Sequence, residues 1–404
     1  MIMADNNENK VLNVPHLRFP EFTEEWEETT LGKISEITKG SGISKDQLSE
    51  QGSPCILYGE LYTKYKSEII DEVYSRTELD SSSLVKSKAN DVIIPCSGET
   101  AIDISTARCV PFNNILLGGD LNIIRLKHDD GGFFAYQLNG ARKKDIARVA
   151  QGVSVVHLYG ENLKHIRVYH PAIEEQKKIT RLLSLIDERI ATQNKIIEKL
   201  QSLIKGLIDD IITLKCGQLV AFETLYSKAG EGGTPTTSNT EFYDNGSIPF
   251  IKIDDLSNKY LSANKDYITE LGLKKSSAWL IPTHSIIYSN GATIGAISIN
   301  KYPVCTKQGI LGIVPNTNID VEFLYYFMQS SYFQKEVERV VTEGTMKTAY
   351  LKDINHIKCP IPDLDRQKEI SHLLSVLSLK EDVERQLLQK YQIQKQYLLR
   401  KMFI

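Results

Sequence analysis

The sequence predicts an α+β fold in which two domains of mixed β/α structure are separated by two long helices. These helices are expected to form an antiparallel coiled coil, so that the whole is a pseudo-two-fold internal repeat. Three observations predict it. A segment near the middle of the 404-residue chain recurs near its end, a heptad pattern begins at each copy, and short β-branched or aromatic runs precede each copy.

The repeat is clearest where "QKKITRLLSLID" (176–187) resembles "QKEISHLLSVLS" (367–378), at an offset of 191 residues. Seven of the sixteen positions of Pro171–Ile186 are identical in Pro362–Leu377, where chance would supply about one. Further matches upstream are Tyr159 with Tyr350, His165 with His356, and Ile166 with Ile357. The period is too long for a solenoid, so the pattern indicates a duplicated module made of a variable body and a better matched helix.

The bodies are predicted to be mostly β-structure with one longer helix each. Gly, Asn, Asp and Pro separate the candidate strands. The helices are expected over Phe133–Asn139 and Val321–Val341. The candidate strands are Ile56–Tyr58, Val92–Ile94, Ile115–Leu117, Asn122–Leu126, Phe250–Ile253, Ser285–Tyr288, Ala296–Ile299 and Ile310–Val314.

The segments after Pro171 and Pro362 change to a helical period. In the first, two series that each advance by seven residues are apolar except at Gln193, which is the pattern of a coiled-coil seam. A helix of about 40 residues is roughly 60 Å long and needs a long partner, which the second segment supplies. The alternative is two independent surface helices. The residues expected at the helix interface are Ile179, Leu183, Ile186, Ile190, Ile197, Leu200, Ile370, Leu374, Leu377 and Leu388.

Composition limits the classes of protein. The net charge of −3 does not indicate a nucleic-acid binder by itself, although Arg142, Lys143, Lys144 and Arg148 give residues 140–170 a local basic excess. A solvated helix face would explain that excess equally well. No apolar run could span a membrane, and the polar start is unlike a signal peptide. Six scattered cysteines without metal-ligand spacing favour reduced core thiols, so we expect a cytoplasmic protein with no metal.

Motifs for catalysis are missing. There is no phosphate-binding G-x-x-x-x-G-K-[ST] loop, no Asn/Asp-Pro-Pro-aromatic motif of a DNA amino-methyltransferase, and no H-E-x-x-H pattern. A Glu-x-Lys sequence of the kind that nucleases use to hold a metal occurs as Glu8-Asn9-Lys10, within the polar N-terminal segment. What remains are polar loops after the candidate strands, rich in Lys, Ser, Thr, Asn, Gln, Tyr and Gly. Such residues hydrogen-bond phosphates and base edges, although each loop alone could be an ordinary turn.

The residues resemble the specificity (S) subunit of type I restriction–modification enzymes over nearly the whole chain from about residue 14. The order head, helix, head, helix carries the resemblance. The duplicated Pro–acidic–Gln-Lys-x-Ile opening also carries it, as do "LRFPEFTEEWEETTLGKISEI" (17–37) and "GSPCILYGELYTKY" (52–65). The family's Gly-x-Thr-Pro loop is present as Gly232-Gly233-Thr234-Pro235, whereas the first head has Lys39-Gly40-Ser41-Gly42-Ile43 instead.

The resemblance implies a non-catalytic subunit. Each head would be a target recognition domain that reads one half of a bipartite, asymmetric site in double-stranded DNA, and the helices would act as a spacer. Two methylation (M) subunits would dock around the helices, and restriction (R) subunits would join them. S-adenosylmethionine, ATP and Mg would be bound by those partners and none by this chain. The implied domains are residues 14–171 and 216–362 as recognition domains, and 172–215 and 363–404 as spacer helices.

Two other readings stay open. The chain could be a coiled-coil scaffold whose heads bind something other than DNA, or it could be a stand-alone methyltransferase that binds S-adenosylmethionine without partners. Under the favoured reading, loop position and side-chain type select thirteen residues as DNA contacts. They are Lys39, Lys45, Tyr58, Ser97, Gln151 and Ser154 in the first head, and Lys252, Asn290, Thr293, Lys307, Gln308, Thr345 and Lys347 in the second.

Overall fold

The fold is described from a computed structural model, in which residues 12–152, 154–213, 217–291, 293–342 and 347–404 are placed, with the side chains of 211–213 left aside. The chain divides into two compact units. Unit 1 combines Met1–Asn194 with Gln386–Ile404, and unit 2 is the continuous stretch Lys195–Arg385. Each unit therefore contains one head, part of the first long helix and part of the second.

The head of unit 1 is built on two four-stranded sheets with strand orders β2-β10-β6-β8 and β3-β5-β4-β9. Two short antiparallel pairs, β1 with β12 and β7 with β11, complete its β-structure in the described residues. The strands are β1 (Glu27–Thr30), β2 (Ser35–Lys39), β3 (Leu48–Ser49), β4 (Ser53–Ile56), β5 (Ser75–Thr77), β6 (Asp91–Pro95), β7 (Ser97–Gly98), β8 (Arg108–Val110), β9 (Leu116–Leu117), β10 (Leu121–Leu126), β11 (Val156–His157) and β12 (Arg167–His170).

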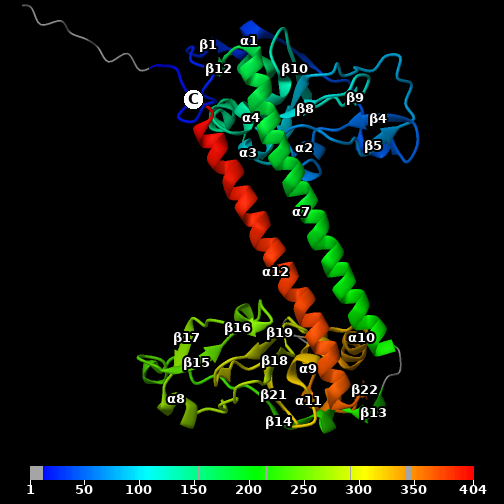
Figure 1. Cartoon of the computed structure of the whole chain (residues 1–404), viewed down its shortest axis with the longest axis vertical. Coiled ribbons are helices and arrows are strands. Elements are labelled where there is room, and N and C mark those ends of the chain that lie inside the picture. The colour runs from blue at the N-terminus through cyan, green and yellow to red at the C-terminus, as the bar shows by residue number, and fades with distance from the viewer. Residues whose placement is uncertain (1–11, 153, 214–216, 292, 343–346) are drawn as a thin grey trace, which may run out of the picture. The chain divides into compact units, whose positions relative to one another are not determined.

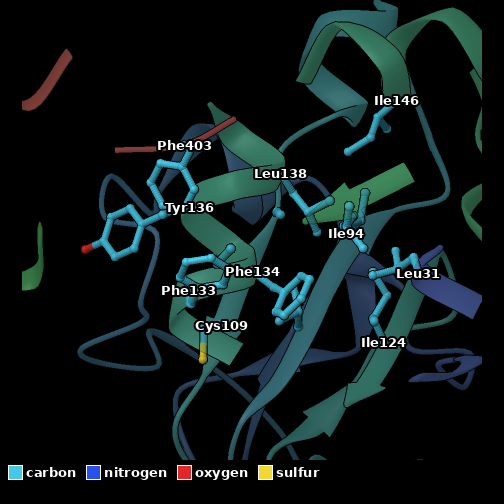
Figure 2. Packing of buried hydrophobic residues seen from close by; sticks show 14 of the residues in the cluster. Leu31, Ile94, Cys109, Ile124, Phe133, Phe134, Tyr136, Leu138, Ile146 and Phe403 are labelled. Carbon is cyan, nitrogen blue, oxygen red and sulfur yellow. The ribbon is translucent and has the colours of Figure 1, made fainter. Parts of the chain in front are cut away.

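Helices cover one side of the β2-β10-β6-β8 sheet, and the main core of unit 1 lies between these helices and the sheet. Figure 2 shows part of this core, where Phe134 and Leu138 of one helix pack toward Ile94 and Ile124 of the sheet. Burial of these apolar side chains is the main source of stability for such a layer. The helices of this head are α1 (Leu31–Ile34), η1 (Lys45–Gln47), α2 (Glu60–Thr63), α3 (Ala101–Ile104), α4 (Gly131–Asn139), α5 (Lys143–Val149) and α6 (Gly160–Lys164).

The two long helices are α7 (Ile173–Thr213), of 41 residues, and α12 (Leu364–Lys401), of 38 residues. In unit 1, α7 begins beside the head and α12 ends there (Figure 1). Lys395 near the end of α12 forms an ion pair with Asp187 of α7 at 2.5 Å. Six residues later, Lys401 O accepts a hydrogen bond from Leu17 N–H. The neighbouring Arg18 forms an ion pair with Glu175, which is twelve residues before Asp187 on α7. As one helix advances the other retreats, so the two run antiparallel in this unit.

The residues that follow α12 help to complete the core of unit 1. Phe403 is buried, and its ring centroid lies 5.2 Å from that of Phe133 and 6.3 Å from that of Trp26. Figure 2 shows the Phe403 ring beside Tyr136. Leu398 and Met402 are buried in the same cluster. The two ends of the described chain therefore meet in one hydrophobic core.

Unit 2 repeats this plan with a different body. A five-stranded sheet has the order β14-β21-β18-β19-β16, a three-stranded sheet has the order β17-β15-β20, and β13 pairs with β22. The strands are β13 (Gln218–Ala221), β14 (Tyr226–Glu231), β15 (Ile248–Ile251), β16 (Tyr260–Leu261), β17 (Asp266–Ile268), β18 (Ile286–Ser289), β19 (Ile297–Asn300), β20 (Cys305–Thr306), β21 (Ile310–Pro315) and β22 (Lys358–Ile361).

The helix expected over Val321–Val341 is broken at Ser330 into α9 (Val321–Gln329) and α10 (Ser331–Val340), which corrects the prediction. Ser330 adopts an extended backbone, and its hydroxyl accepts a hydrogen bond from Phe333 N–H at 3.1 Å, so it starts a second helix. The other helices of this head are η2 (Phe222–Leu225), η3 (Thr240–Phe242), η4 (Ile253–Asp255), α8 (Glu270–Lys274) and α11 (Leu351–Ile354).

Equivalent backbone contacts show that the two heads share one frame. Leu31 N–H donates to Ile166 O at 3.0 Å in unit 1, and Phe222 N–H donates to Ile357 O at 2.9 Å in unit 2, both pairs being offset by 191 residues. The pairing of β1 with β12 is likewise repeated as β13 with β22. The fold is thus an α+β internal repeat with two mixed heads and two long helices, as predicted.

Candidate nucleic-acid interface

In both heads a glycine lies where the first strand of the main sheet ends. Gly40 N–H donates to Leu121 O at 3.0 Å, and Gly232 N–H donates to Ile310 O at 2.9 Å. A Cβ on Gly40 would lie 1.9 Å from Gly118 O, and one on Gly232 would lie 2.2 Å from Thr306 O. Only glycine permits this close approach of backbones, so the differing motifs "KGSGI" and "GGTP" have one glycine position in common.

Several residues predicted to contact DNA in the first head lie close together. Lys39, at the end of β2, has its Nζ 5.9 Å from the centre of the Tyr159 ring. Ser97 of β7 pairs with His157 of β11, and the backbones of Gln151 and His157 bond to each other in both directions. Three segments distant in the sequence therefore form one polar surface around Tyr159.

The remaining predicted residues of the first head lie elsewhere. Lys45 is exposed in η1, after the loop that follows β2. Tyr58 is half-buried after β4 and packs against a separate small core. Ser154 is exposed beside residue 153, which lies outside the described residues. Each of these assignments as a DNA contact stays a prediction.

Asn290 in the second head is buried rather than exposed. Its Nδ2 donates to Ala349 O at 3.1 Å, and its backbone O accepts from Ala349 N–H at 2.9 Å. The first head has an equivalent contact from a different strand, because Asn122 Nδ2 of β10 donates to Leu158 O at 2.9 Å. Asn290 therefore holds the loop around residue 349 in place, whatever contact it makes with a ligand.

A second group in this head gathers around Gly309. Its backbone O accepts from Asn290 N–H at 3.1 Å, and its N–H donates to Glu231 Oε1 at 2.8 Å. The preceding residues, Lys307 and Gln308, are exposed, and Gln308 N–H contacts Thr234 Oγ1 at 3.5 Å. The loops after β14, β18 and β20 thus meet at one place and present Lys307 and Gln308 to solvent.

The other predicted residues of the second head are spread more widely. Thr293 is exposed in the turn between β18 and β19. Lys347 is exposed and lines a cavity of about 520 Å³ with Tyr288 and residues of α10. Lys252 is exposed and forms an ion pair with Asp266 at 2.8 Å, which screens its charge from a phosphate. Thr345 lies outside the described residues.

The residues predicted at the helix interface divide between the two units. In unit 1, Ile179, Leu183 and Ile186 are buried in the core of the first head, and Ile190 is partly buried against it. In unit 2, Ile370 and Leu374 are buried in the core of the second head. Ile197 is buried, and Leu200, Leu377 and Leu388 are half-buried. The first turns of each long helix are thus anchored to the head that precedes them.

Exposed aromatic residues were not among the predicted contacts. Tyr159 and Tyr350 lie at equivalent positions directly before α6 and α11, and both side chains are exposed. The signal was available in the sequence, because the two tyrosines match at the 191-residue offset. The prediction selected residues by loop position and side-chain type, and it did not use recurrence at the repeat offset as a criterion.

The cysteines of the described residues are free and buried. Burial raises the pKa of the Cys96 thiol to about 11, against the opposing effect of Lys39, and raises the pKa of Cys359 to about 12. A thiol with such a pKa is protonated at neutral pH and is a poor nucleophile. Within the described ranges, no group of three His, Cys, Asp or Glu side chains could hold a metal ion, and no helix is long and apolar enough to cross a membrane.

The comparisons with known proteins agree with this geometry. The profile of the family described as "Type I restriction modification DNA specificity domain" matches residues 23–202 and 226–391, which together are most of the chain. The chain belongs to this family. Each matched stretch takes in one head of this DNA specificity protein and the first part of the long helix that follows it.

Relatives of this specificity-family chain include two from Methanocaldococcus jannaschii. The putative MjaX specificity subunit is 26% identical over 285 residues, which are 65% of this chain and 64% of that protein, just under two thirds. The MjaVIII specificity subunit is 23% identical over 98% of this chain and 95% of its own length. The crystal structure of the S subunit of a type I restriction-modification system from M. genitalium matches with a TM-score of 0.63 at 16% identity, covering 97% of this chain and 99% of the other, and so shares the fold.

Proposed function

We propose that this chain is the DNA sequence-recognition subunit of a type I restriction–modification complex, and that each head reads one half of a bipartite, asymmetric site. One observation carries the proposal. The family profile matches each half of the chain separately, and the two halves place unlike polar loops on a common frame. A shared backbone frame lets both heads bind the same kind of ligand, DNA. Loops that differ in sequence would contact different bases.

The long helices would fix the distance between the half-sites and bind the methylation subunits. Large apolar side chains are exposed along both helices, which is unusual for a surface without a partner. These side chains are Leu185, Ile196 and Leu203 on α7 and Leu373, Val376, Leu379, Val383, Ile393 and Tyr397 on α12. We assign them to the docking surfaces for two methylation subunits, with restriction subunits joining the assembly.

The chemistry would be performed by those partners. Adenine methylation would use S-adenosylmethionine in the methylation subunits, and ATP with Mg would act in the restriction subunits. This chain would supply the choice of DNA sequence and no reacting group. Work on chromosomal DNA would place the assembly in the cytoplasm.

A head exchange tests the proposal. The chain is co-expressed with its methylation subunit, and methylated adenines are mapped across the host genome. Replacing residues 217–362 with the second head of another specificity subunit is expected to change one half of the motif and leave the other half and the spacing as they were. A protein whose heads bind a ligand other than DNA would give no bipartite motif, and a motif unaffected by the exchange would refute the assignment of the second head.

A further inference from the structure

Tyr159 and Tyr350 are large aromatic side chains that both heads leave in solvent. Each is 46% exposed, and they occupy the same place in the repeat, 191 residues apart. Between the shared anchors the two bodies differ in sequence, strand number and loop length. A single exposed aromatic residue is normal on a protein surface. One that recurs at the same place in two otherwise dissimilar heads indicates a role that the heads share.

The backbone before each tyrosine is held firmly. Leu158 and Ala349, the preceding residues, are fully buried, and their carbonyl oxygens accept hydrogen bonds from the side chains of Asn122 and Asn290. Their N–H groups donate to Cys96 O at 2.8 Å and to Asn290 O at 2.9 Å. Asn122 lies in β10, whereas Asn290 directly follows β18, so the heads hold the equivalent carbonyl from different elements.

The backbone after each tyrosine is held as well. Tyr159 O accepts from Asn162 N–H at 3.0 Å, and Tyr350 O accepts from Asp353 N–H at 2.9 Å, at the start of α6 and α11. The residues four positions after each tyrosine, Leu163 and Ile354, are fully buried. Each ring thus projects from a fixed main chain, and little conformational freedom remains to be lost when it binds a ligand.

A lysine accompanies each ring. Lys39 Nζ lies 5.9 Å from the Tyr159 ring centre, and Lys352 Nζ lies 5.6 Å from the Tyr350 ring centre. Lys39 comes from the end of β2, whereas Lys352 lies on α11. The pairing of a rigid aromatic side chain with an ammonium group therefore arises twice from different elements. Each ring thus carries a phenol hydroxyl and has an ammonium group over its face, and both groups can donate hydrogen bonds to an anionic oxygen.

The ligand must be common to both half-sites, because the feature is common to both heads. Under the proposed function the bases of the half-sites differ, but the sugar–phosphate backbone is the same at each. Backbone contacts position a protein on the duplex without reading its sequence. We infer that Tyr159 and Tyr350 are twin positioning residues that bind the DNA backbone at equivalent points of the two half-sites, each with its neighbouring lysine. This inference rests on the proposed function.

The test uses the full chain co-purified with its methylation subunit and two labelled duplexes, one with the mapped motif and one unrelated. Tyr159→Phe and Tyr350→Phe remove only the hydroxyl, and each is expected to weaken binding of both duplexes about tenfold, the effect of one hydrogen bond to a charged group. Lys39→Met and Lys352→Met should each lower the slope of log affinity against log salt by about 0.9. The methylated motif should stay unchanged in every variant.

Tyr74 provides the matched control. It is 51% exposed in the first head but lies near Asp71 and Glu72, where a phosphate would be repelled, so Tyr74→Phe should leave both affinities unchanged. Three results for the Tyr→Phe variants would overturn the inference. The first is a change in one half of the methylated motif, and the second is unchanged binding of both duplexes. The third is loss of the methylation subunit from the variant while each intact complex keeps its full DNA affinity. If the unaltered complex itself shows no preference for its motif, the proposed function fails, and that outcome is separate from a failure of the tyrosines alone.

Discussion

Gln176 Oε1 accepts a hydrogen bond from the backbone N–H of Asp130 at 2.9 Å, and this joins the start of α7 to the start of α4. Its Nε2 also donates to Pro171 O at 2.9 Å. Gln367 repeats both contacts, with Asp320 N–H and Pro362 O at the same distances. The repeated Gln-Lys of the sequence is therefore a buried clamp that orients each long helix on the head before it.

Replacing a clamp should destabilise one unit and spare the other. Gln176→Leu leaves Asp130 N–H and Pro171 O without partners, at a cost of about 1–3 kcal/mol in the unfolding free energy. Each unit has one tryptophan, Trp26 in unit 1 and Trp279 in unit 2, so urea unfolding of each unit can be followed by fluorescence. A W279F background reports on unit 1, and a W26F background reports on unit 2. Gln367→Leu should affect Trp279 instead. Lys177→Ala, an exposed neighbour, is the control and should change little.

Lys395 should be required for unit 1. Its Nζ lies 2.5 Å from both Glu68 Oε2 and Asp187 Oδ1, and all three side chains are largely buried. Burial, then the nearby Glu68, raises the pKa of Asp187 to about 6 despite the opposing effect of Lys395. Lys395→Met leaves two buried carboxylates facing each other. We therefore expect the unfolding free energy of unit 1, followed by the fluorescence of Trp26, to fall by about 3–5 kcal/mol.

A double variant separates charge from packing at this site. Adding Asp187→Asn to Lys395→Met removes one of the two carboxylates, so part of the lost stability should return. The exposed Lys390→Met on the same helix should have no measurable effect. Equal stability of the single and double variants would show that repulsion between Glu68 and Asp187 does not cause the loss, which would then come from packing.

The stability of unit 1 should depend on His170 above neutral pH. His170 Nδ1 lies 3.1 Å from Asp129 Oδ1, and this hydrogen bond raises the pKa of His170 despite its burial. A raised pKa in the folded state means that the stabilisation is complete below the unfolded value, about 6.5, and is lost as pH rises through the folded value. The unfolding free energy should therefore fall as pH rises from about 6.5, and His170→Asn should abolish that decline.

Asp129 gives the opposite behaviour in acid. Burial alone would raise its pKa, but hydrogen bonds from His170 and Gln176 lower it below the ordinary value. Its contribution is present above the unfolded pKa, about 3.9, and disappears as pH falls through the lower folded value. Asp129→Asn should therefore flatten the acid side of the profile and weaken the alkaline decline as well, whereas His170→Asn should act most strongly on the alkaline side.

Substitutions at Asn290 and Lys307 should have different effects in the second head: the first should lower stability, and the second should weaken DNA binding. Asn290→Ala removes the contact with Ala349 O and should lower the stability of unit 2 by about 1–3 kcal/mol in the Trp279 signal. Lys307→Ala changes an exposed side chain and should leave unfolding unchanged while weakening DNA binding and its salt dependence. If Lys307→Ala left DNA affinity at two salt concentrations intact, Lys307 would not be a phosphate contact.

Lengthening both long helices should widen the spacer of the motif. Seven residues inserted after Asn194 and seven after Arg385 add about 10 Å of helix, equivalent to about three base pairs of duplex. The mapped motif should gain about three unspecified positions with both half-sites unaltered. A single insertion in α7 is the control, since it disturbs the match between the helices and should reduce activity rather than move the spacing cleanly.

Sequence reasoning succeeded where a pattern is long. The heptads of α7 persist over many turns, and the Gln-Lys repeat marks both helix starts, so the repeat and its helices were predictable. Periodicity does not say what covers an apolar face. Ile179 and Leu183 fit a helix–helix seam, yet they are buried among the head's own residues, because a phenylalanine-rich helix lies within reach only after the chain has folded.

Single loop residues were less predictable for a related reason. Asn290 has the polarity of a ligand contact, but a carbonyl 59 residues further along the chain takes its amide. Ser330 interrupts a continuous helical pattern through its own hydroxyl, and composition alone does not reveal that break. Such partners are set by long-range packing, which a local reading of the sequence does not contain.

The placement of Phe403 has a consequence for protein synthesis. The first head to leave the ribosome needs Leu398, Met402 and Phe403 to close its core, and at about 5–20 residues per second these arrive roughly 10–40 s after residue 194. Unit 2, which is continuous in sequence, can finish folding earlier. The nascent first head therefore waits with an open apolar patch around Trp26 and Phe133, and a ribosome that stalls before residue 398 would leave that patch for chaperones and proteases to find.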